Sequence, residues 1–183
     1  MAVKVAFLQN SDCWGCHQSL LNLHLGLLKV LPALEIVYWP AVVDFKYESL
    51  KAREDGEILV GFVEGTLRTK HDIEQTKILR QKSALIVAFG TCSCYGSVKG
   101  LANQWNKDNL VKRKFSEVES IADGSGGEPM INMPGFADKI IPVDEIIKVD
   151  AYMSGCPPKP EAIASAVVFL LGQKPFPMND LAF

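Results

Sequence analysis

The sequence lacks a strong net charge, a basic segment and a long apolar run. Its 183 residues include 19 Lys and Arg against 21 Asp and Glu, a formal net charge of -2. This balance gives no positive field for nucleic acid, and no cluster of lysine and arginine is present to bind anionic lipid. No segment approaches the roughly 20 apolar residues that a membrane span needs. We therefore expect neither nucleic acid nor a membrane span.

A secretory signal is also missing from the N-terminus. The first ten residues hold a short apolar stretch but no small-residue cleavage site, so we expect a cytoplasmic protein. Five cysteines in such a chain are more typical of metal ligands or catalytic thiols than of a disulfide framework.

The composition is that of a folded domain, with 48% apolar and 22% charged residues. The length suits one domain, residues 1–183. The pattern weakens in an irregular excursion around 105–143, where Asp123–Pro129 and Met133–Gly135 are rich in glycine and proline. Loops of that length are usually functional or contact a partner, and a mobile surface insert is the alternative.

Five short apolar runs predict buried strands, because near-continuous apolar sequence is typical of strands covered on both faces. They are Val3–Leu8, Leu34–Trp39, Ile58–Val63, Ala84–Phe89 and the weaker Ile146–Ala151. Helical patterns lie at His17–Val30, at Asp72–Lys82, and from Pro160 to an end near Gly172. This alternation predicts an α/β fold, a flavodoxin-like parallel sheet with helices on both faces.

The loops after these predicted strands contain cysteines. Cys13 and Cys16 follow the first strand, Cys92 follows the fourth, and Cys156 follows the fifth. In open parallel sheets, sites form beyond the carboxyl ends of the strands. The predicted fold therefore brings these four cysteines to one edge of the sheet.

The spacing of these cysteines suits a metal centre. Cys13-Trp-Gly-Cys16 places two thiols on one turn, and Cys92 and Cys156 each lie close after a glycine, where the backbone can approach a bulky inorganic group. Four thiolates satisfy the ligation of a [4Fe-4S] cluster. Zinc is the competing metal, but zinc sites with four cysteines usually take them as two local pairs.

Two alternatives concern the same thiols. Cys94 lies two positions after Cys92 and is the other candidate for the third ligand, although we favour Cys92. A Cys-x-x-Cys motif between a strand and a helix is also the thioredoxin arrangement. A thiol-disulfide oxidoreductase using Cys13 and Cys16 is therefore our second hypothesis, although it leaves Cys92 and Cys156 without a role.

Two polar residues flank the predicted site. His17 either donates a hydrogen bond to a cluster sulfur or is a plain polar residue at a helix start. Glu64 ends a predicted strand and is either a buried carboxylate or a solvated loop residue. The leucine-rich segment after Cys16 is apolar on more than one stripe, which favours a subunit that packs against a partner.

With these residues identified, the chain resembles the small subunit of nickel-iron hydrogenases over most of its length. Four motifs occur in the order of that family: Cys13-Trp-Gly-Cys16, Phe62-Val-Glu-Gly65, Gly90-Thr-Cys92 and Gly155-Cys-Pro-Pro158. The resemblance implies that Cys13, Cys16, Cys92 and Cys156 hold one [4Fe-4S] cluster, proximal to a nickel-iron centre in a separate large subunit. Related subunits of respiratory complex I carry adjacent cysteines in the first motif, so a complex-I-like subunit is the less favoured alternative.

Within that family the chain is most similar to the cytoplasmic NAD-reducing, bidirectional hydrogenases. No cysteine follows Cys156, so we expect the chain to hold one cluster only. The resemblance implies that electrons pass to a diaphorase module, with NAD as the acceptor, and that no catalytic residue lies in this chain. Gln18 stands where many hydrogenases have glutamate, and it cannot titrate, so no proton-relay role is carried over to it. FMN is left open, since no phosphate-cradling glycine loop other than the cysteine loop supports it.

Overall fold

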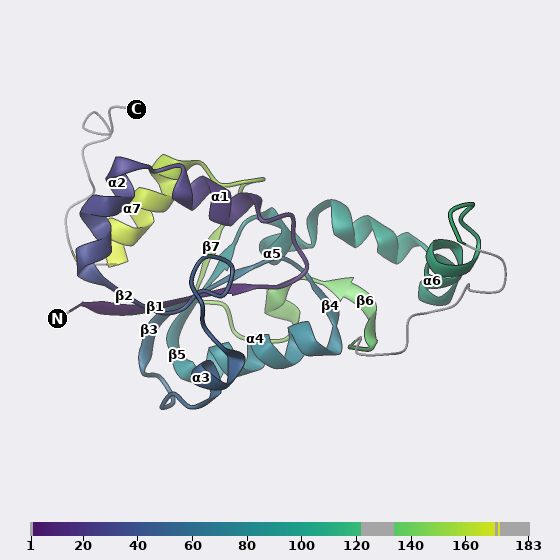
Figure 1. The fold of residues 1–183 in the computed structure, drawn as a ribbon, viewed down its shortest axis with the longest axis horizontal. Helices are drawn as coiled ribbons and strands as arrows, with labels where there is room; N and C mark the ends of the chain where they lie inside the picture. Colours follow the sequence, from purple (N-terminus) through teal and green to yellow (C-terminus); the bar gives the residue numbers. More distant parts are fainter. Residues whose placement is uncertain (1, 122–133, 171, 173–183) are drawn as a thin grey trace.

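A five-stranded parallel sheet forms the centre of the chain in this computed structural model, which describes residues 2–121, 134–170 and 172. Its strands are β1 (Val3–Gln9), β2 (Leu34–Tyr38), β3 (Ile58–Glu64), β5 (Ser83–Phe89) and β7 (Ala151–Met153). The strand order is β2-β1-β3-β5-β7, and every pairing is parallel (Figure 1). This is the strand order of flavodoxin-like sheets, so the predicted fold class is confirmed.

Helices cover both faces of this sheet (Figure 1). One face carries α1 (Gly15–Leu21), α2 (Leu25–Val30) and α7 (Pro160–Leu170), and the other carries α3 (Tyr47–Lys51) and α4 (Lys70–Lys82). Successive strand residues point to opposite faces and so enter two separate cores. Val5 and Phe7 pack toward α1, α2 and α7 in an aromatic-rich core, whereas Ala6 and Leu8 join a mainly aliphatic core with α3 and α4.

The predicted helix His17–Val30 is divided in two. The chain turns between α1 and α2, where His24 has a φ of 47°, and this turn places Leu23 in the aromatic-rich core. The helix α4 begins before its predicted start because Thr69 and Asp72 form a reciprocal capping box. The predicted start of the last helix at Pro160 is confirmed.

The predicted strand Ile146–Ala151 is wrong except for its last residue. A 3-10 helix, η3 (Val143–Glu145), precedes it, and Ile147 packs into the aliphatic core instead of pairing in the sheet. The Ile86 N–H donates to the carboxylate of Asp150 at 2.9 Å, and the Asp150 N–H donates to the Ile86 carbonyl. Regular pairing with β5 begins only at Ala151.

Regular elements also occupy much of the excursion predicted around 105–143. The helix α5 (Thr91–Tyr95) and the 3-10 helix η2 (Ser97–Gln104) lead into α6 (Lys107–Ser116). Further along, β6 (Phe136–Ile141) pairs antiparallel with β4 (Leu67–Thr69) in a second sheet beside the main one (Figure 1). The expectation of irregular structure is therefore wrong for α6 and β6, while Asp123–Pro129 and Met133 lie outside the described residues. Among the described residues, no helix is long and apolar enough to cross a bilayer.

Candidate metal centre

Three loops at the carboxyl ends of β1, β5 and β7 carry the four predicted ligands. Cys13 follows β1 and Cys16 lies in the first turn of α1; Cys92 is the second residue of α5, and Cys156 follows β7. The strands β5 and β7 are neighbours, and β3 alone separates β5 from β1. The sheet therefore directs all three loops to one edge, as the sequence predicts.

Glycines let these loops close upon one another. A Cβ atom added to Gly90 would overlap the Sγ of Cys16, and one added to Gly15 would lie 3.3 Å from the Sγ of Cys13. The Thr91 N–H donates to the Gly155 carbonyl at 2.9 Å, and the Gly155 N–H donates to the Thr91 Oγ1 at 3.0 Å. The β5 and β7 loops are thus bonded to each other, and the thiol of Cys16 lies against the first of them.

The four thiols differ in exposure but influence one another. Cys13 and Cys156 are exposed, Cys92 is half-buried and Cys16 is buried. Burial raises the pKa of the Cys16 thiol far above its usual range; Glu64 raises it further, and Cys92 and Cys13 add to this. Burial also raises the pKa of Cys92, with smaller contributions from Cys156 and Cys13. Cys92 therefore lies within electrostatic reach of the other three thiols, and metal binding at Cys16 and Cys92 must displace protons.

Cys94 has a different environment from Cys92. Its thiol is buried in the core and donates a hydrogen bond to the Ala88 carbonyl at 3.5 Å. Burial raises the pKa of Cys94 to about 11. This placement supports Cys92 as the predicted third ligand.

Glu64 is a buried carboxylate and not a solvated loop residue, the two alternatives that the sequence leaves open. Its side chain is 1% exposed at the end of β3, and it accepts the backbone N–H groups of Cys16 at 3.1 Å and His17 at 3.3 Å. Burial, helped by the nearby Asp12, raises the pKa of Glu64 to about 7. Glu64 therefore fixes the start of α1, the turn that carries Cys16.

His17 is a core residue and not a surface polar residue at a helix start. Its ring lies among those of Phe7, Trp39 and Phe89, and burial lowers its pKa to about 4. The Nδ1 atom lies 3.4 Å from the Oε2 of Glu64, but neither ring nitrogen makes a hydrogen bond within the described part of the chain. His17 is therefore neutral at pH 7.

Two further residues near the site escape sequence reasoning. The Ser19 hydroxyl donates to the Pro158 carbonyl at 2.5 Å and ties α1 to the loop that carries Cys156. The Nζ of Lys99, in η2, is buried without a hydrogen-bond partner among the described residues, and its charge opposes the rise in the pKa of Cys92. The Ser19 hydrogen bond has no local sequence signal, because it joins segments 139 residues apart.

The donor set and its surroundings fit a thiolate-bound cluster. The four thiols lie near glycines on loops at one edge of the sheet, and four thiolates satisfy the ligation of an iron-sulfur cluster. Within the described ranges, no group of three or more His, Cys, Asp or Glu is arranged to hold a metal ion. The assignment of a cluster therefore rests on the four cysteines and on the placement of their loops.

Comparison with known proteins identifies the family. Residues 13–170 match the family described as the 20 kDa subunit of NADH ubiquinone oxidoreductase. The chain belongs to this family. Its relatives include a subunit of the F420-non-reducing hydrogenase vhu of Methanocaldococcus jannaschii, 40% identical over 176 residues. That match covers 96% of this chain but only 58% of the relative, so the chain spans little more than half the length of that protein.

Two further matches concern NAD-reducing hydrogenases. The delta subunit of the NAD-reducing hydrogenase HoxS of Cupriavidus necator is 27% identical over 176 residues, covering 95% of this chain and 81% of that subunit. A crystal structure of an NAD+-reducing [NiFe]-hydrogenase in the H2-reduced state has a TM-score of 0.85 and 26% identity, covering 100% and 99% of the two chains. The predicted resemblance to hydrogenase small subunits is confirmed, and it extends to the F420-non-reducing type, which the sequence reasoning did not consider.

Proposed function

We propose that this chain is the electron-transfer small subunit of a [NiFe] hydrogenase. It relays electrons between a nickel-iron site in a large subunit and a diaphorase module, through one [4Fe-4S] cluster held by Cys13, Cys16, Cys92 and Cys156. The observation that carries the proposal is the convergence of these four thiols on three loops at a single sheet edge, where hydrogen bonds join the β5 and β7 loops. The hydrogenase relatives support the reaction class.

Each residue around the thiols has a positioning role in this proposal. Glu64 fixes the turn that presents Cys16, Ser19 holds α1 against the Cys156 loop, and Gly90 leaves room for the Cys16 thiol. When bound, the cluster takes up and releases single electrons, with a potential set by burial, charge and hydrogen bonds to its sulfurs. The chain itself needs no general acid or base, because hydrogen is split or formed in the partner.

The electron acceptor is inferred from the NAD-reducing relatives. The delta subunit of the NAD-reducing hydrogenase HoxS and the NAD+-reducing [NiFe]-hydrogenase structure both match this chain over nearly all of its residues. These two relatives support NAD as the acceptor, in a cytoplasmic enzyme. Identification of the subunits that co-purify with the chain tests this part of the proposal separately.

Hydrogen reduction of the assembled enzyme tests the function. The chain, isolated anaerobically with its large subunit, should show the broad brown absorption of an iron-sulfur cluster. Under hydrogen that absorption should bleach and a paramagnetic signal should appear, while the chain alone should not react with hydrogen. One bound zinc and no iron would overturn the electron-relay function. Insulin reduction by the metal-free chain that is lost in Cys13→Ser would instead support the thiol-disulfide hypothesis.

A further inference from the structure

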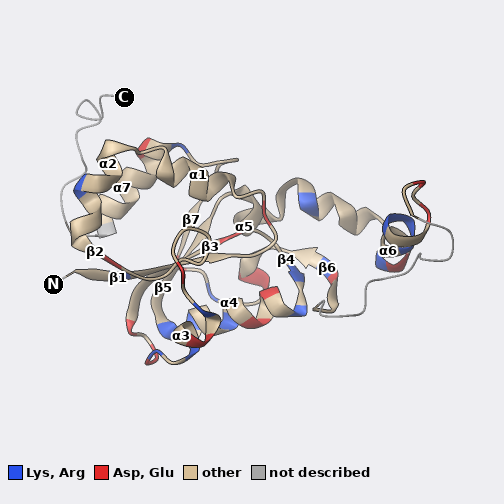
Figure 2. Cartoon of the chain, viewed as in Figure 1, with Lys and Arg blue, Asp and Glu red and all other residues tan. Residues whose placement is uncertain are grey.

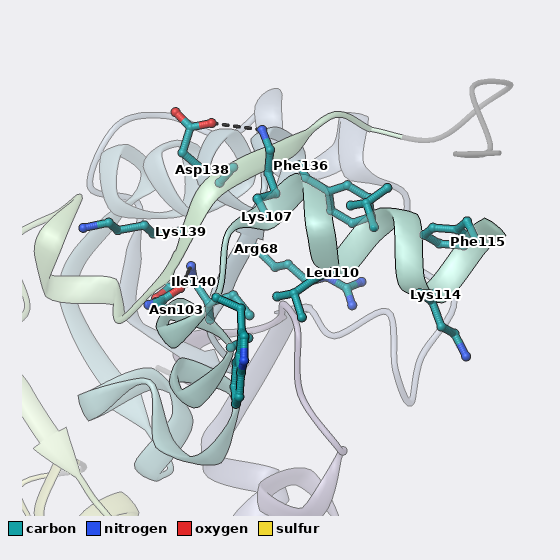
Figure 3. A pocket seen from close by; sticks show the side chains of 14 residues that line it. Arg68, Asn103, Lys107, Leu110, Lys114, Phe115, Phe136, Asp138, Lys139 and Ile140 are labelled. Atoms are coloured by element: carbon teal, nitrogen blue, oxygen red, sulfur yellow. Dashed lines mark hydrogen bonds and ion pairs between the residues drawn. The ribbon is translucent and has the colours of Figure 1, made fainter. Parts of the chain in front are cut away.

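A second site, without cysteines, lies beside the main sheet. A cavity of about 290 Å³ opens where η2 and α6 meet β6 (Figure 3). Aromatic and aliphatic side chains from these segments form much of its wall, among them Trp105, Leu110, Phe115 and Phe136. Trp105 is 60% exposed, which is unusual for a tryptophan without a ligand or partner.

The cavity is also positively charged. Its lining includes four cationic side chains, Arg68, Lys107, Lys114 and Lys139, and a single carboxylate, Asp138, which pairs with Lys107 at 3.0 Å. Arg68 extends into the middle of the cavity, beside Leu110, with its guanidinium 5.9 Å from the centre of the Phe136 ring (Figure 3). Within residues 2–121 and 134–170, no carboxylate pairs with that guanidinium. The cavity therefore offers this guanidinium and aromatic ring faces to the same ligand.

Hydrogen bonds hold the wall of this cavity in place. The Asn103 side chain donates to the Ile140 carbonyl at 2.7 Å and accepts the Ile140 N–H at 2.8 Å, which bonds η2 to β6. At the start of α6, the Asn106 side chain accepts the N–H groups of Asp108 and Asn109. The cavity is therefore formed before any ligand arrives, as is usual for small-molecule sites.

We propose that this cavity binds a mononucleotide, a planar aromatic base that carries a phosphate group. Its volume lies just below the usual range for ligand pockets, roughly 300–1,000 Å³, and suits a small ligand such as one base with its sugar. Trp105 offers an exposed ring on which a base stacks, and Arg68 offers a planar fork of donors for phosphate oxygens. Because Asp138 already pairs with Lys107, the lining does not repel an anion. The proposal is independent of the cluster, since no cysteine lines the cavity.

Calorimetric titration of the full chain with three probes tests the ligand class. ADP should bind saturably, with one site per chain. Two probes should each bind at least about 10-fold more weakly than ADP. Adenosine lacks the phosphates and so loses the contact with Arg68, and pyrophosphate lacks the base and so loses stacking on Trp105. An absence of saturable ADP binding, or pyrophosphate binding as tight as ADP binding, would overturn the proposal.

Variants locate the binding at this cavity. Arg68→Gln and Trp105→Ala should each weaken ADP binding about 10-fold, while Trp105→Phe, which keeps an aromatic face, should retain most of it. Arg113→Gln is the matched control, because Arg113 is exposed on α6 but does not line the cavity; it should change the affinity less than about 2-fold. Equal losses in Arg113→Gln and Arg68→Gln would show nonspecific attraction by surface charge and refute the site. Thermal unfolding of each variant verifies that the fold is intact.

Discussion

The two helical layers of the sheet differ sharply in charge. The helices α1, α2 and α7 contain one lysine and one glutamate among them, Lys29 and Glu161, whereas α4 alone contains six charged residues (Figure 2). The charge-poor layer also exposes large apolar side chains, with Leu25 75% and Phe169 75% exposed. The charged layer is therefore suited to face solvent, and the charge-poor layer is suited to pack against another protein surface.

The buried residues of the two layers differ as well. The core beneath α1, α2 and α7 contains Cys16 and packs the His17 ring against aromatic rings, whereas the core beneath α3 and α4 is mainly aliphatic. Buried polar groups cost stability unless they are bonded, and Glu64 is bonded to the N–H groups of Cys16 and His17. One layer therefore includes a predicted ligand and the carboxylate that positions it, and the other packs mainly aliphatic side chains.

Among the substitutions that probe the two layers, replacement of Gly90 by alanine should have the largest effect on stability and on bound iron. The new Cβ atom would overlap the Cys16 thiol, and the φ of 88° adds left-handed strain, so we expect a loss of about 4 kcal/mol in the free energy of unfolding and of most bound iron. Gly56→Ala is the matched control, because Gly56 has a φ of 73° with nothing near its Cβ position. It should cost about 1–2 kcal/mol and keep the iron. Equal results for the two variants in urea unfolding and iron analysis would contradict the proposed closeness of the loops.

Leu79→Ala, in the aliphatic core, should reduce stability without affecting the site. Leu79 is fully buried under the sheet, so the truncation should cost about 3 kcal/mol through lost burial and the cavity that it leaves. Iron per folded chain should remain unchanged. A loss of iron beyond the loss of folded protein would show that the two layers are not separate in function.

Asp150→Asn probes the edge of the charged layer at acid pH. The Ile86 N–H, together with Arg80, holds the pKa of the Asp150 carboxyl below its ordinary value of 3.8. The charged form therefore stabilises the fold above that value, and this stabilisation is lost as the pH falls below it. We expect Asp150→Asn to cost about 1–2 kcal/mol at pH 7, a difference that shrinks below about pH 4. A constant difference between urea unfolding curves at pH 7 and pH 3 would refute this assignment.

Leu25→Gln should have the smallest effect. Because the side chain is mostly exposed on α2, its replacement should change the free energy of unfolding by less than about 0.5 kcal/mol. Leu20→Ala, on the buried side of the neighbouring α1, should cost about 3 kcal/mol. If thermal unfolding shows similar losses of stability for Leu25→Gln and Leu20→Ala, the exposed apolar surface stabilises the chain's own fold.

The long central strands could be predicted because both of their faces are buried and their sequences are nearly all apolar. β4 and β7 have three residues each, too few for a pattern, and the carboxylate of Asp150 takes the bonding position just before β7. The helix α6 has no buried residue, so it leaves no clear apolar stripe. These elements depend on their neighbours and not on local sequence.

The position of the cysteines could also be predicted, since strand ends determine which loops meet. The roles of Glu64 and Ser19 could not, because Glu64 binds backbone groups 47 and 48 residues away and Ser19 binds one 139 residues away. Burial of His17 likewise requires rings contributed by β1 and β5 and by Trp39, which follows β2. The ligands themselves remain a prediction.

Iron and sulfide analysis of Cys92→Ser beside Cys94→Ser tests the proposed cluster most directly. The two positions are two residues apart in α5, but the thiol of Cys94 bonds the Ala88 carbonyl in the core. Chain reconstituted anaerobically with iron and sulfide should bind about four iron atoms in the wild type and in Cys94→Ser. The same procedure should leave Cys92→Ser without a stable cluster. A full iron content in Cys92→Ser together with its loss in Cys94→Ser would contradict the proposed ligand set.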